Sequence, residues 1–272
     1  MQTPIGVFDS GYGGLTVLKE ITKHLPQYDY IYLGDNARAP YGNRSFETVY
    51  HYTLQCVQWL FKQGCPLIVL ACNTASAKAL RTIQQNDLEK NSPGKKVLGV
   101  IRPTTEIINN YSKTNHVGIM ATSGTVNSNS YAIEIEKFFP DTTVVQQACP
   151  MLVPLIENNE FKNEGADFFI KKYTKALIEQ DDKIDTILLA CTHYPLIKKD
   201  IENFLPKNIT VIAQGEIVAA SLEDYLHRHT EIEIQLSKNK SIEFFTTDAA
   251  DDFNNHASIF YGEAVKAKHV EL

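Results

Sequence analysis

Two cysteines occur in the same local pattern in two distant parts of the sequence. Residues 67–75 read LIVLACNTA and residues 187–194 read ILLACTHY, so each apolar run ends in Ala-Cys and polar residues follow. Cys72 and Cys191 are 119 positions apart (191 − 72). One Cys at the end of an apolar strand is usually a small buried hydrophobe. Two in equivalent surroundings favour a shared chemical role.

Two equivalent thiols suggest an acid and a base on opposite faces of one carbon. One thiolate removes a proton while the other thiol delivers one from the far side, so the centre inverts without a cofactor. An ordinary thiol, with a pKa of about 8.5, is mostly protonated near neutral pH, so a neighbouring group must help to form the thiolate. A helix N-terminus after each cysteine would favour the anion. A single Cys with a His base would instead suggest acyl transfer.

Three further residues are candidates for managing the proton. Asp9 ends the first apolar run, at the level of Cys72 in the expected sheet, and His193 stands two residues after Cys191. Glu157, in PMLVPLIENNE, lies in the second part of the chain and is placed to pair with His193. The other cysteines lack such surroundings and are expected to be structural: Cys56, Cys65 and Cys149.

A glycine-containing turn, DSGYGGLT at 9–16, follows the first apolar run. It begins like the dinucleotide fingerprint G-x-G-x-x-G, but Thr16 stands where the third glycine belongs, and no P-loop Gly-Lys-Ser/Thr follows. We expect the amides of Gly11, Gly13 and Gly14 to bind a carboxylate. Zinc sites need recognisable ligand spacing, and the sequence has neither C-x-x-C nor H-x-x-x-H, so no metal is expected.

Apolar runs and amphipathic segments alternate along the chain, which predicts an α/β fold with mainly parallel sheets flanked by helices. The expected strands are 4–9, 29–34, 67–72, 96–101, 116–121, 142–147, 184–190 and 209–213. The expected helices include 45–63, 74–90, 164–180 and 195–204. The polar run 230–242 is expected to form a solvated hairpin or edge strand.

A second matched pair of segments supports a duplicated chain. IGVFDSGYGG at 5–14 has its counterpart in VGIMATSGT at 117–125, again an apolar run that enters a glycine-containing turn. We therefore expect two similar α/β subdomains, residues 1–97 with 211–272 and residues 98–210, with the site in the cleft between them. Ligands of such sheets bind at the carboxyl ends of the strands, where both cysteines fall.

Composition narrows the class of protein. The chain has 272 residues, 43% of them hydrophobic, and a formal net charge of -6, with no cluster of Lys and Arg beyond short pairs. Nucleic acid is therefore not an expected partner. No apolar run approaches the roughly 20 residues that cross a bilayer, so no membrane is expected, nor is a secretory signal. Five cysteines without a C-x-x-C pair indicate a cytosolic protein with reduced thiols.

The motifs together resemble the glutamate racemase family, the cofactor-independent members of the aspartate/glutamate racemase superfamily. The matching segments, in chain order, are FDSGYGGLTV at 8–17, YLGDNARAPYG at 32–42, ACNTAS at 71–76, TSGTVNSNSY at 122–131 and ACTHYPL at 190–196. The resemblance implies two α/β subdomains that enclose glutamate. It also implies that no cofactor is needed.

The resemblance implies a role for each candidate residue. Cys72 is expected to work on the D enantiomer and Cys191 on the L enantiomer, assisted by Asp9, Glu157 and His193. The expected substrate contacts are Asp9, Ser10, Tyr41, Gly42, Asn73, Thr74, Thr122, Thr125, Thr192 and His193. The resemblance further implies a homodimer that supplies D-glutamate for peptidoglycan in the cytoplasm.

Three other functions stay open. Aspartate racemases also have two such cysteines, although the motif sequences CNTAS and CTHYPL favour glutamate as the substrate. A nucleotide-dependent oxidoreductase would use the glycine turn but not the paired thiols. A two-lobed solute-binding protein would bind without catalysis, and such proteins usually carry an export signal.

Overall fold

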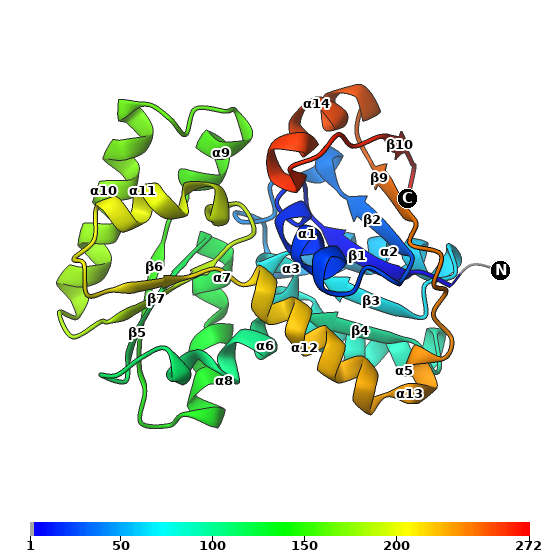
Figure 1. The fold of residues 1–272 in the computed structure, drawn as a ribbon, viewed down its shortest axis with the longest axis horizontal. Coiled ribbons are helices and arrows are strands. Elements are labelled where there is room, and N and C mark those ends of the chain that lie inside the picture. The colour runs from blue at the N-terminus through cyan, green and yellow to red at the C-terminus, as the bar shows by residue number, and fades with distance from the viewer. Residues whose placement is uncertain (1–2) are drawn as a thin grey trace.

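The computed structural model describes residues 3–272 and contains two parallel β-sheets (Figure 1). The strands of the first sheet, in spatial order, are β10 (Ala267–His269), β9 (Ile242–Thr246), β2 (Tyr30–Gly34), β1 (Ile5–Asp9), β3 (Leu67–Leu70) and β4 (Lys96–Gly99). Those of the second are β6 (Thr143–Ala148), β5 (His116–Ala121), β7 (Thr186–Ala190) and β8 (Thr210–Ile212). All neighbouring strands within the described residues pair in parallel. The predicted α/β class is confirmed. We call the parts of the molecule that carry the two sheets the first half and the second half.

Both sheets contain the same arrangement of four strands. The order β2-β1-β3-β4 in the first sheet corresponds to β6-β5-β7-β8 in the second. β1 and β5 are therefore equivalent, as are β3 and β7, the strands that precede Cys72 and Cys191. The repeat expected from the sequence is confirmed. The first sheet is wider, because β9 and β10 extend it, and the apolar runs of the sequence did not indicate these two strands.

Helices cover both sheets and lie on their outer faces as well as between the halves (Figure 1). Those packed on the first half are α1 (Leu15–His24), α2 (Phe46–Lys62), α3 (Asn73–Lys78), α4 (Leu80–Thr82), α5 (Leu88–Asn91), α12 (Gly215–Arg228), α13 (Thr230–Glu233) and α14 (Ala250–Tyr261). Those of the second half are α6 (Ile101–Thr105), α7 (Ser123–Ser128), α8 (Ser130–Phe138), α9 (Leu152–Glu157), α10 (Glu164–Gln180) and α11 (Lys198–Asn203). A π-helical turn, Ile83–Asp87, joins α4 to α5, and short 3₁₀ helices occupy Asn36–Arg38, Ile108–Asn110 and Tyr194–Ile197.

The local sequence explains where the two longest helices begin. Ser45 caps α2, and its Oγ accepts a hydrogen bond from the amide of Thr48 at 3.1 Å. Asn163 caps α10, and its Oδ1 accepts from the amide of Ala166 at 3.0 Å. Such a cap stabilises a helix by about 1 kcal/mol because it satisfies an amide that has no partner within the helix. Both helices agree with the predicted segments.

The strands that lead to the cysteines are buried along their whole length. All residues of β1, β3 and β7 are buried, as expected for strands of a parallel sheet covered on both faces. β3 ends at Leu70 rather than at residue 72, so Cys72 lies just beyond the strand. The apolar runs therefore deliver polar residues to the carboxyl edge of each sheet.

The prediction for residues 230–242 is wrong. Ile232, Ile234 and Leu236 alternate as in a strand with one apolar face, but residues 230–233 form the helix α13 instead. Ile232 and Leu236 are 2% and 6% exposed, whereas Ile234 is 77% exposed. A strand would have placed the three side chains on one face. The helical turn buries two of them against the first half and turns the third to solvent.

The chain crosses between the halves twice. It leaves the first sheet after β4, at Val100, and returns after β8, at Ala213 and Gln214. α12 then packs against both α1 of the first half and α6 of the second, and α3 packs against α7. The proposed subdomain borders, 1–97 with 211–272 and 98–210, stay a prediction, and residues 1 and 2 lie outside the described residues.

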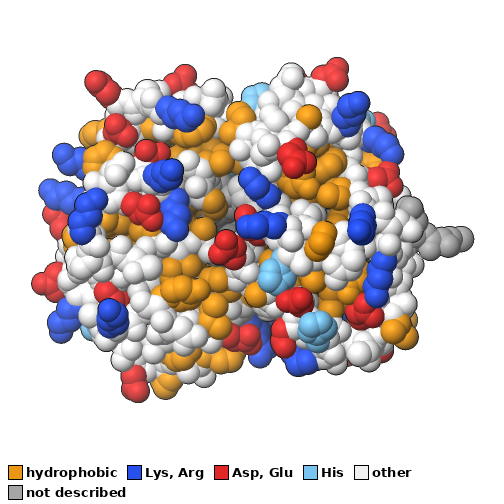
Figure 2. Space-filling view, viewed as in Figure 1, with side chains coloured by type: hydrophobic (Ala, Val, Ile, Leu, Met, Phe, Trp, Pro, Cys, Tyr) orange, Lys and Arg blue, Asp and Glu red, His pale blue; other side chains and the backbone are white. Residues whose placement is uncertain are grey.

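The surface shown in Figure 2 carries Lys, Arg, Asp and Glu side chains interspersed over both halves, with apolar patches between them. This mixture agrees with the small net charge of -6. Within residues 3–272, none of the helices has the length and apolar character that a bilayer crossing requires.

Candidate active site

A cavity between the two halves is lined by both cysteines of the repeat. The first half contributes Ser10, Pro40, Tyr41, Gly42, Asn43, Cys72, Asn73 and Thr74. The second half contributes Thr122, Cys149, Pro150, Val153, Pro154, Glu157, Cys191, Thr192 and His193. These residues follow the carboxyl ends of β1, β2 and β3 in one half and of β5, β6 and β7 in the other. Of the candidate site residues, Asp9 and Thr125 are not in the wall of this cavity.

Cys72 occupies the N-cap position of α3, as expected for a polar group after the strand. Its Sγ accepts a hydrogen bond from the amide of Ala75 at 3.4 Å and lies 3.4 Å from Oγ of Ser10. Burial, together with the negative charge of Asp9, raises the pKa of the Cys72 thiol to about 12. Cys72 is therefore a protonated thiol near neutral pH. The amide at the helix start is a donor for the thiolate when one forms.

Cys191 has a different neighbour. The helix N-terminus expected after Cys191 is absent, because residues 191–193 form a turn and only the short 3₁₀ helix Tyr194–Ile197 follows. Instead, Nδ1 of His193 lies 3.9 Å from the Cys191 sulfur. Pro195 accounts for the difference, because it lacks an amide hydrogen and limits the turn that carries the cysteine. An imidazole thus replaces the helix terminus at the second thiol.

The buried His193 and the partly buried Glu157 form an ion pair in the wall of the cavity. Nε2 of His193 lies 2.9 Å from Oε1 of Glu157. Burial alone lowers the pKa of His193, but the hydrogen bonds and negative charges of Cys191 and Glu157 outweigh it and raise that pKa to about 10. The imidazole is therefore protonated at neutral pH. The ring nitrogen Nδ1 of this cation is the polar group that faces the Cys191 sulfur.

Asp9 lies behind the cavity wall rather than in it. Its side chain is fully buried, where Oδ1 accepts from the amide of Gly11 at 2.9 Å and Oδ2 accepts from Oγ1 of Thr192 at 3.3 Å. Burial raises the pKa of Asp9, while the positive charge of His193 opposes the shift. Asp9 therefore contacts the wall residue Thr192, and its charge reaches His193 and Cys72.

The glycine turn binds a carboxylate of the protein itself. The amide of Gly11 is held by Asp9, and Gly11, Gly13 and Gly14 do not line the cavity, so the expectation that they bind a ligand is wrong. A Cβ on Gly13 would lie 2.2 Å from Oγ1 of Thr192 and 2.4 Å from Nδ1 of His193. Glycine is needed there because the turn after β1 packs directly on the ACTH segment of the other half.

Three threonines join the two halves at another wall of the cavity. Oγ1 of Thr74 lies 3.0 Å from Oγ1 of Thr122 and 3.3 Å from Oγ1 of Thr125, and Thr122 and Thr125 are 3.2 Å apart. Thr125 is fully buried behind the other two. Thr74 and Thr122 present hydroxyls to the cavity, and Thr125 orients them.

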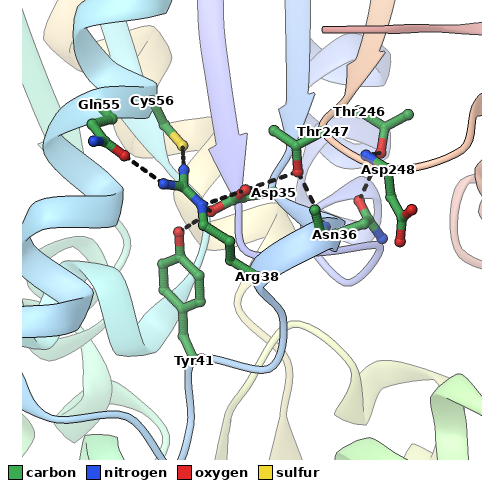
Figure 3. A network of polar contacts seen from close by, with 10 residues as sticks. Asp35, Asn36, Arg38, Tyr41, Gln55, Cys56, Thr246, Thr247 and Asp248 are labelled. Carbon is green, nitrogen blue, oxygen red and sulfur yellow. Dashed lines mark hydrogen bonds and ion pairs between the residues drawn. The ribbon is translucent and has the colours of Figure 1, made fainter. Parts of the chain in front are cut away.

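The segment that carries Tyr41 and Gly42 is held by a buried polar network (Figure 3). The phenol of Tyr41 donates to Oδ2 of Asp35, and Nε of Arg38 lies 2.7 Å from the same oxygen. Oγ1 of Thr247 donates to Oδ1 of Asp35 at 2.8 Å, which ties the segment to the end of β9. The Tyr41 hydroxyl therefore anchors the loop. What Tyr41 offers the cavity is its ring and backbone.

Several wall residues escaped the sequence argument: Pro40, Asn43, Cys149, Pro150, Val153 and Pro154. Cys149, which the sequence predicted to be structural, is buried and also lines the cavity. A signal was present, because Cys149 follows β6 within Ala148-Cys149-Pro150, which repeats the Ala-Cys ending of the other two strands. The similarity to the other two Ala-Cys endings was not recognised because Pro150, rather than a helix-capping residue, follows Cys149.

The cavity is small, with a volume of about 40 Å³. This volume is only a few times the roughly 10–15 Å³ that a single buried water needs. An amino acid with a dicarboxylate skeleton is larger than this volume. A wider groove of about 550 Å³, lined by Lys19, Lys23 and Tyr261 among others, lies away from the cysteines. Among residues 3–272, no group of three His, Cys, Asp or Glu side chains is arranged to hold a metal ion.

Comparison with known proteins places this geometry in context. The family model described as Asp/Glu/hydantoin racemase matches residues 5–222. The chain is 36% identical over 270 residues to a glutamate racemase of Sulfurihydrogenibium sp., covering 99% of this chain and 97% of that protein. It is 40% identical over 258 residues to a glutamate racemase of Geobacter metallireducens, covering 95% and 92%.

Solved structures show the same likeness. The glutamate racemase isoform RacE1 of Bacillus anthracis superposes with a TM-score of 0.90 at 34% identity, covering 99% of this chain and 98% of that chain. A glutamate racemase of Francisella tularensis in complex with D-glutamate superposes with a TM-score of 0.87 at 32% identity, with the same coverage.

Proposed function

This chain belongs to the Asp/Glu/hydantoin racemase family, and from that premise we propose that it interconverts L-glutamate and D-glutamate by proton transfer at Cα between two thiols. The observation that carries the proposal is that Cys72 and Cys191, at equivalent strand ends of a duplicated fold, line one cavity between the halves.

The two thiols differ in a way that suits opposite roles. Cys72 holds its proton near neutral pH, while the imidazolium of His193 lies 3.9 Å from the Cys191 sulfur. With L-glutamate bound, the Cys191 thiolate takes the Cα proton and the Cys72 thiol gives its own proton to the opposite face. The Cα–H bond on the face toward Cys191 breaks, and a new Cα–H bond forms on the face toward Cys72. Release of D-glutamate then leaves a Cys72 thiolate and a Cys191 thiol. The reverse reaction runs the same steps backward.

The carbanion-like intermediate needs stabilising donors, because a carboxylate that already carries its charge makes the Cα proton a very weak acid. Hydroxyls of Ser10, Thr74, Thr122 and Thr192 and the amide of Asn73 line the cavity and are the donors within reach. Such preorganised donors act strongly when water is excluded. The charge around the two thiols is set by Asp9, Glu157 and His193. The wall of the cavity is shaped by Thr125, Tyr41 and Gly42.

The biological setting follows from the reaction. D-glutamate produced by the enzyme would supply peptidoglycan synthesis in the cytoplasm, and the enzyme would act as a homodimer of two-subdomain chains. Aspartate is the alternative substrate, since it differs from glutamate by one methylene. A methylene in a pocket changes the transition-state free energy by about 1–3 kcal/mol, so comparing kcat/KM for the two amino acids decides between them.

The test is to incubate the enzyme with L-glutamate in deuterated water, following optical rotation and the Cα–H signal by NMR. The expected result is loss of rotation, with deuterium at Cα of the D-glutamate formed and little in the remaining L-glutamate at early times, because separate thiols handle the two faces. Retained rotation, with glutamate bound but unchanged, would instead indicate a binding protein. Equal labelling of both enantiomers from the start would refute the two-thiol mechanism.

A further inference from the structure

We propose that Tyr131 and Gln214 are positioning residues that orient the Asn73 amide toward a carboxylate of the substrate and tie that orientation to the place where the chain crosses between the halves. The inference rests on the proposed function and extends it to two residues that lie outside the cavity.

Asn73 carries a donor that the protein leaves without a partner. The residue follows Cys72, is 2% exposed and lines the cavity. Its Nδ2 finds no hydrogen-bond partner among residues 3–272, although the atom is buried. A buried amide without a partner is costly, so such an atom in a cavity wall indicates a place for an acceptor from a ligand. A carboxylate oxygen of glutamate is such an acceptor.

Tyr131 fixes which end of the Asn73 amide faces the cavity. The tyrosine is fully buried in α8 of the second half, and its hydroxyl donates to Oδ1 of Asn73. The same hydroxyl accepts a hydrogen bond from Nε2 of Gln214 at 2.7 Å. Because Gln214 donates, the hydroxyl proton must point to Asn73. The Asn73 carbonyl oxygen is then occupied, and the NH₂ group is left for the cavity.

Gln214 connects this chain of hydrogen bonds to the two crossings. It is 4% exposed and stands between β8 and α12, at the second crossing. Its Nε2 also lies 3.1 Å from the carbonyl oxygen of Val100, at the first crossing, and 3.0 Å from Oγ1 of Thr104. One of its two N–H bonds is donated to the tyrosine that orients Asn73, at the shortest distance, and the other is shared between the two acceptors at the first crossing. A rotation of one half against the other must disturb these bonds together.

The relay of hydrogen bonds links the relative position of the two halves to the orientation of Asn73. The relay runs from the second half, through Tyr131, to an amide of the first half that is adjacent to the Cys72 thiol. Asn73 has its donor aimed at the cavity only while the halves hold the relative position seen here. Closing the halves on the substrate and presenting the carboxylate donor are then one event rather than two.

The test compares KM and kcat for L-glutamate in Tyr131→Phe, Gln214→Glu and the double variant. Tyr131→Phe removes only the hydroxyl, and Gln214→Glu replaces the donor by an acceptor of the same shape, which draws the tyrosine proton away from Asn73. We expect each single variant to raise KM about tenfold with a smaller change in kcat. We expect the double variant to lose no more than the worse single variant, because both act through one chain.

Tyr30→Phe is the matched control, since the Tyr30 hydroxyl is also buried and donates to the carbonyl oxygen of Leu25, away from the cavity. It should lower the melting temperature as Tyr131→Phe does but leave KM unchanged. If both Tyr131→Phe and Gln214→Glu keep KM within twofold of the active parent enzyme, the proposal is overturned. Should Tyr131→Phe not fold, Gln214→Glu alone decides by the same criterion. A parent enzyme that does not racemise glutamate would refute the proposed function instead.

Discussion

Nε2 of His193 lies 2.9 Å from Oε1 of Glu157, and the other ring nitrogen of His193 faces the Cys191 sulfur at 3.9 Å. The imidazole is thus held between a carboxylate and a thiol, and its pKa is raised to about 10 although burial opposes this. The sequence placed all three residues in one site. Their order, with the histidine in the middle, is what the structure adds.

Replacing Glu157 by Gln should lower stability in a pH-dependent way. The folded pKa of His193, about 10, is above the unfolded value of about 6.5, so the pair stabilises the protein fully below pH 6.5 and its contribution is lost as the pH rises through 10. We expect Glu157→Gln to cost on the order of 2 kcal/mol at pH 6 and less toward pH 10. Melting temperatures across this range measure the effect.

The exposed pair of His24 and Glu223, at 2.7 Å, provides the control for that experiment. Both side chains are about two-fifths exposed (43% and 41%), so Glu223→Gln should cost less than about 0.5 kcal/mol. A cost of Glu157→Gln that is independent of pH, or no larger than that of the control, would show that the buried pair does not hold the proton on His193.

Removing either thiol should abolish inversion at Cα but leave exchange of the Cα proton with solvent for one enantiomer. Cys72→Ser and Cys191→Ser should each lower racemisation by roughly 10³-fold, because one proton donor or acceptor is lost. Cys72→Ser should still exchange the Cα proton of L-glutamate in deuterated water, and Cys191→Ser that of D-glutamate. NMR follows the exchange and polarimetry the inversion. Exchange of the opposite enantiomer in each variant would reverse the assignment of the thiols.

Gly13→Ala should damage the site without changing any group that acts on substrate. The added Cβ would lie 2.2 Å from Oγ1 of Thr192 and 2.4 Å from Nδ1 of His193, so one of the packed segments must move. We expect kcat/KM for glutamate to fall at least tenfold, since a small displacement of catalytic groups has a large effect on rate. Gly165→Ala, in α10, is the control, because its Cβ meets only Oδ1 of Asn163, at 3.1 Å. Equal activity of the two variants would contradict close packing at Gly13.

Asp35→Asn should loosen the segment that carries Tyr41. The Asp35 carboxylate is fully buried and binds Arg38, so the substitution leaves a guanidinium with a weaker partner and should cost about 3 kcal/mol. KM for glutamate should rise with it, because Tyr41 and Gly42 line the cavity. Denaturant unfolding and steady-state kinetics measure both effects. Asp224→Asn, in an exposed pair with Arg228, should change neither, and a matching loss there would argue against a special role for the network.

Apolar runs predicted the strands of the core well, because a parallel sheet covered on both faces requires continuous hydrophobic segments. The two Ala-Cys motifs likewise revealed the duplication. The hydrophobic periodicity could not show where a turn exposes an apolar side chain to solvent. Ile234 alternates correctly for a strand, yet it lies on the solvent side of α13 and is 77% exposed.

The missing parts of the site have different causes. Cys149 lines the cavity through the end of β6, and its Ala-Cys ending was a local signal that was not used. Tyr131 contacts Asn73, and Gln214 contacts Tyr131, only because two crossings meet. These contacts depend on the relative position of segments far apart in the chain, which local patterns do not encode. The helix expected after Cys191 failed for a local reason, the proline at 195.

The unequal surroundings of the two sulfurs cannot favour one direction of the reaction. Mirror-image amino acids have the same free energy in water, so the equilibrium mixture must be equal and kcat/KM must be identical in the two directions. An aspartate beside Cys72 and a histidine beside Cys191 nevertheless give the two sulfurs different electrostatic surroundings, so kcat and KM can each differ between the enantiomers. Any advantage in turnover for one enantiomer must therefore appear as an equally higher KM for that same enantiomer.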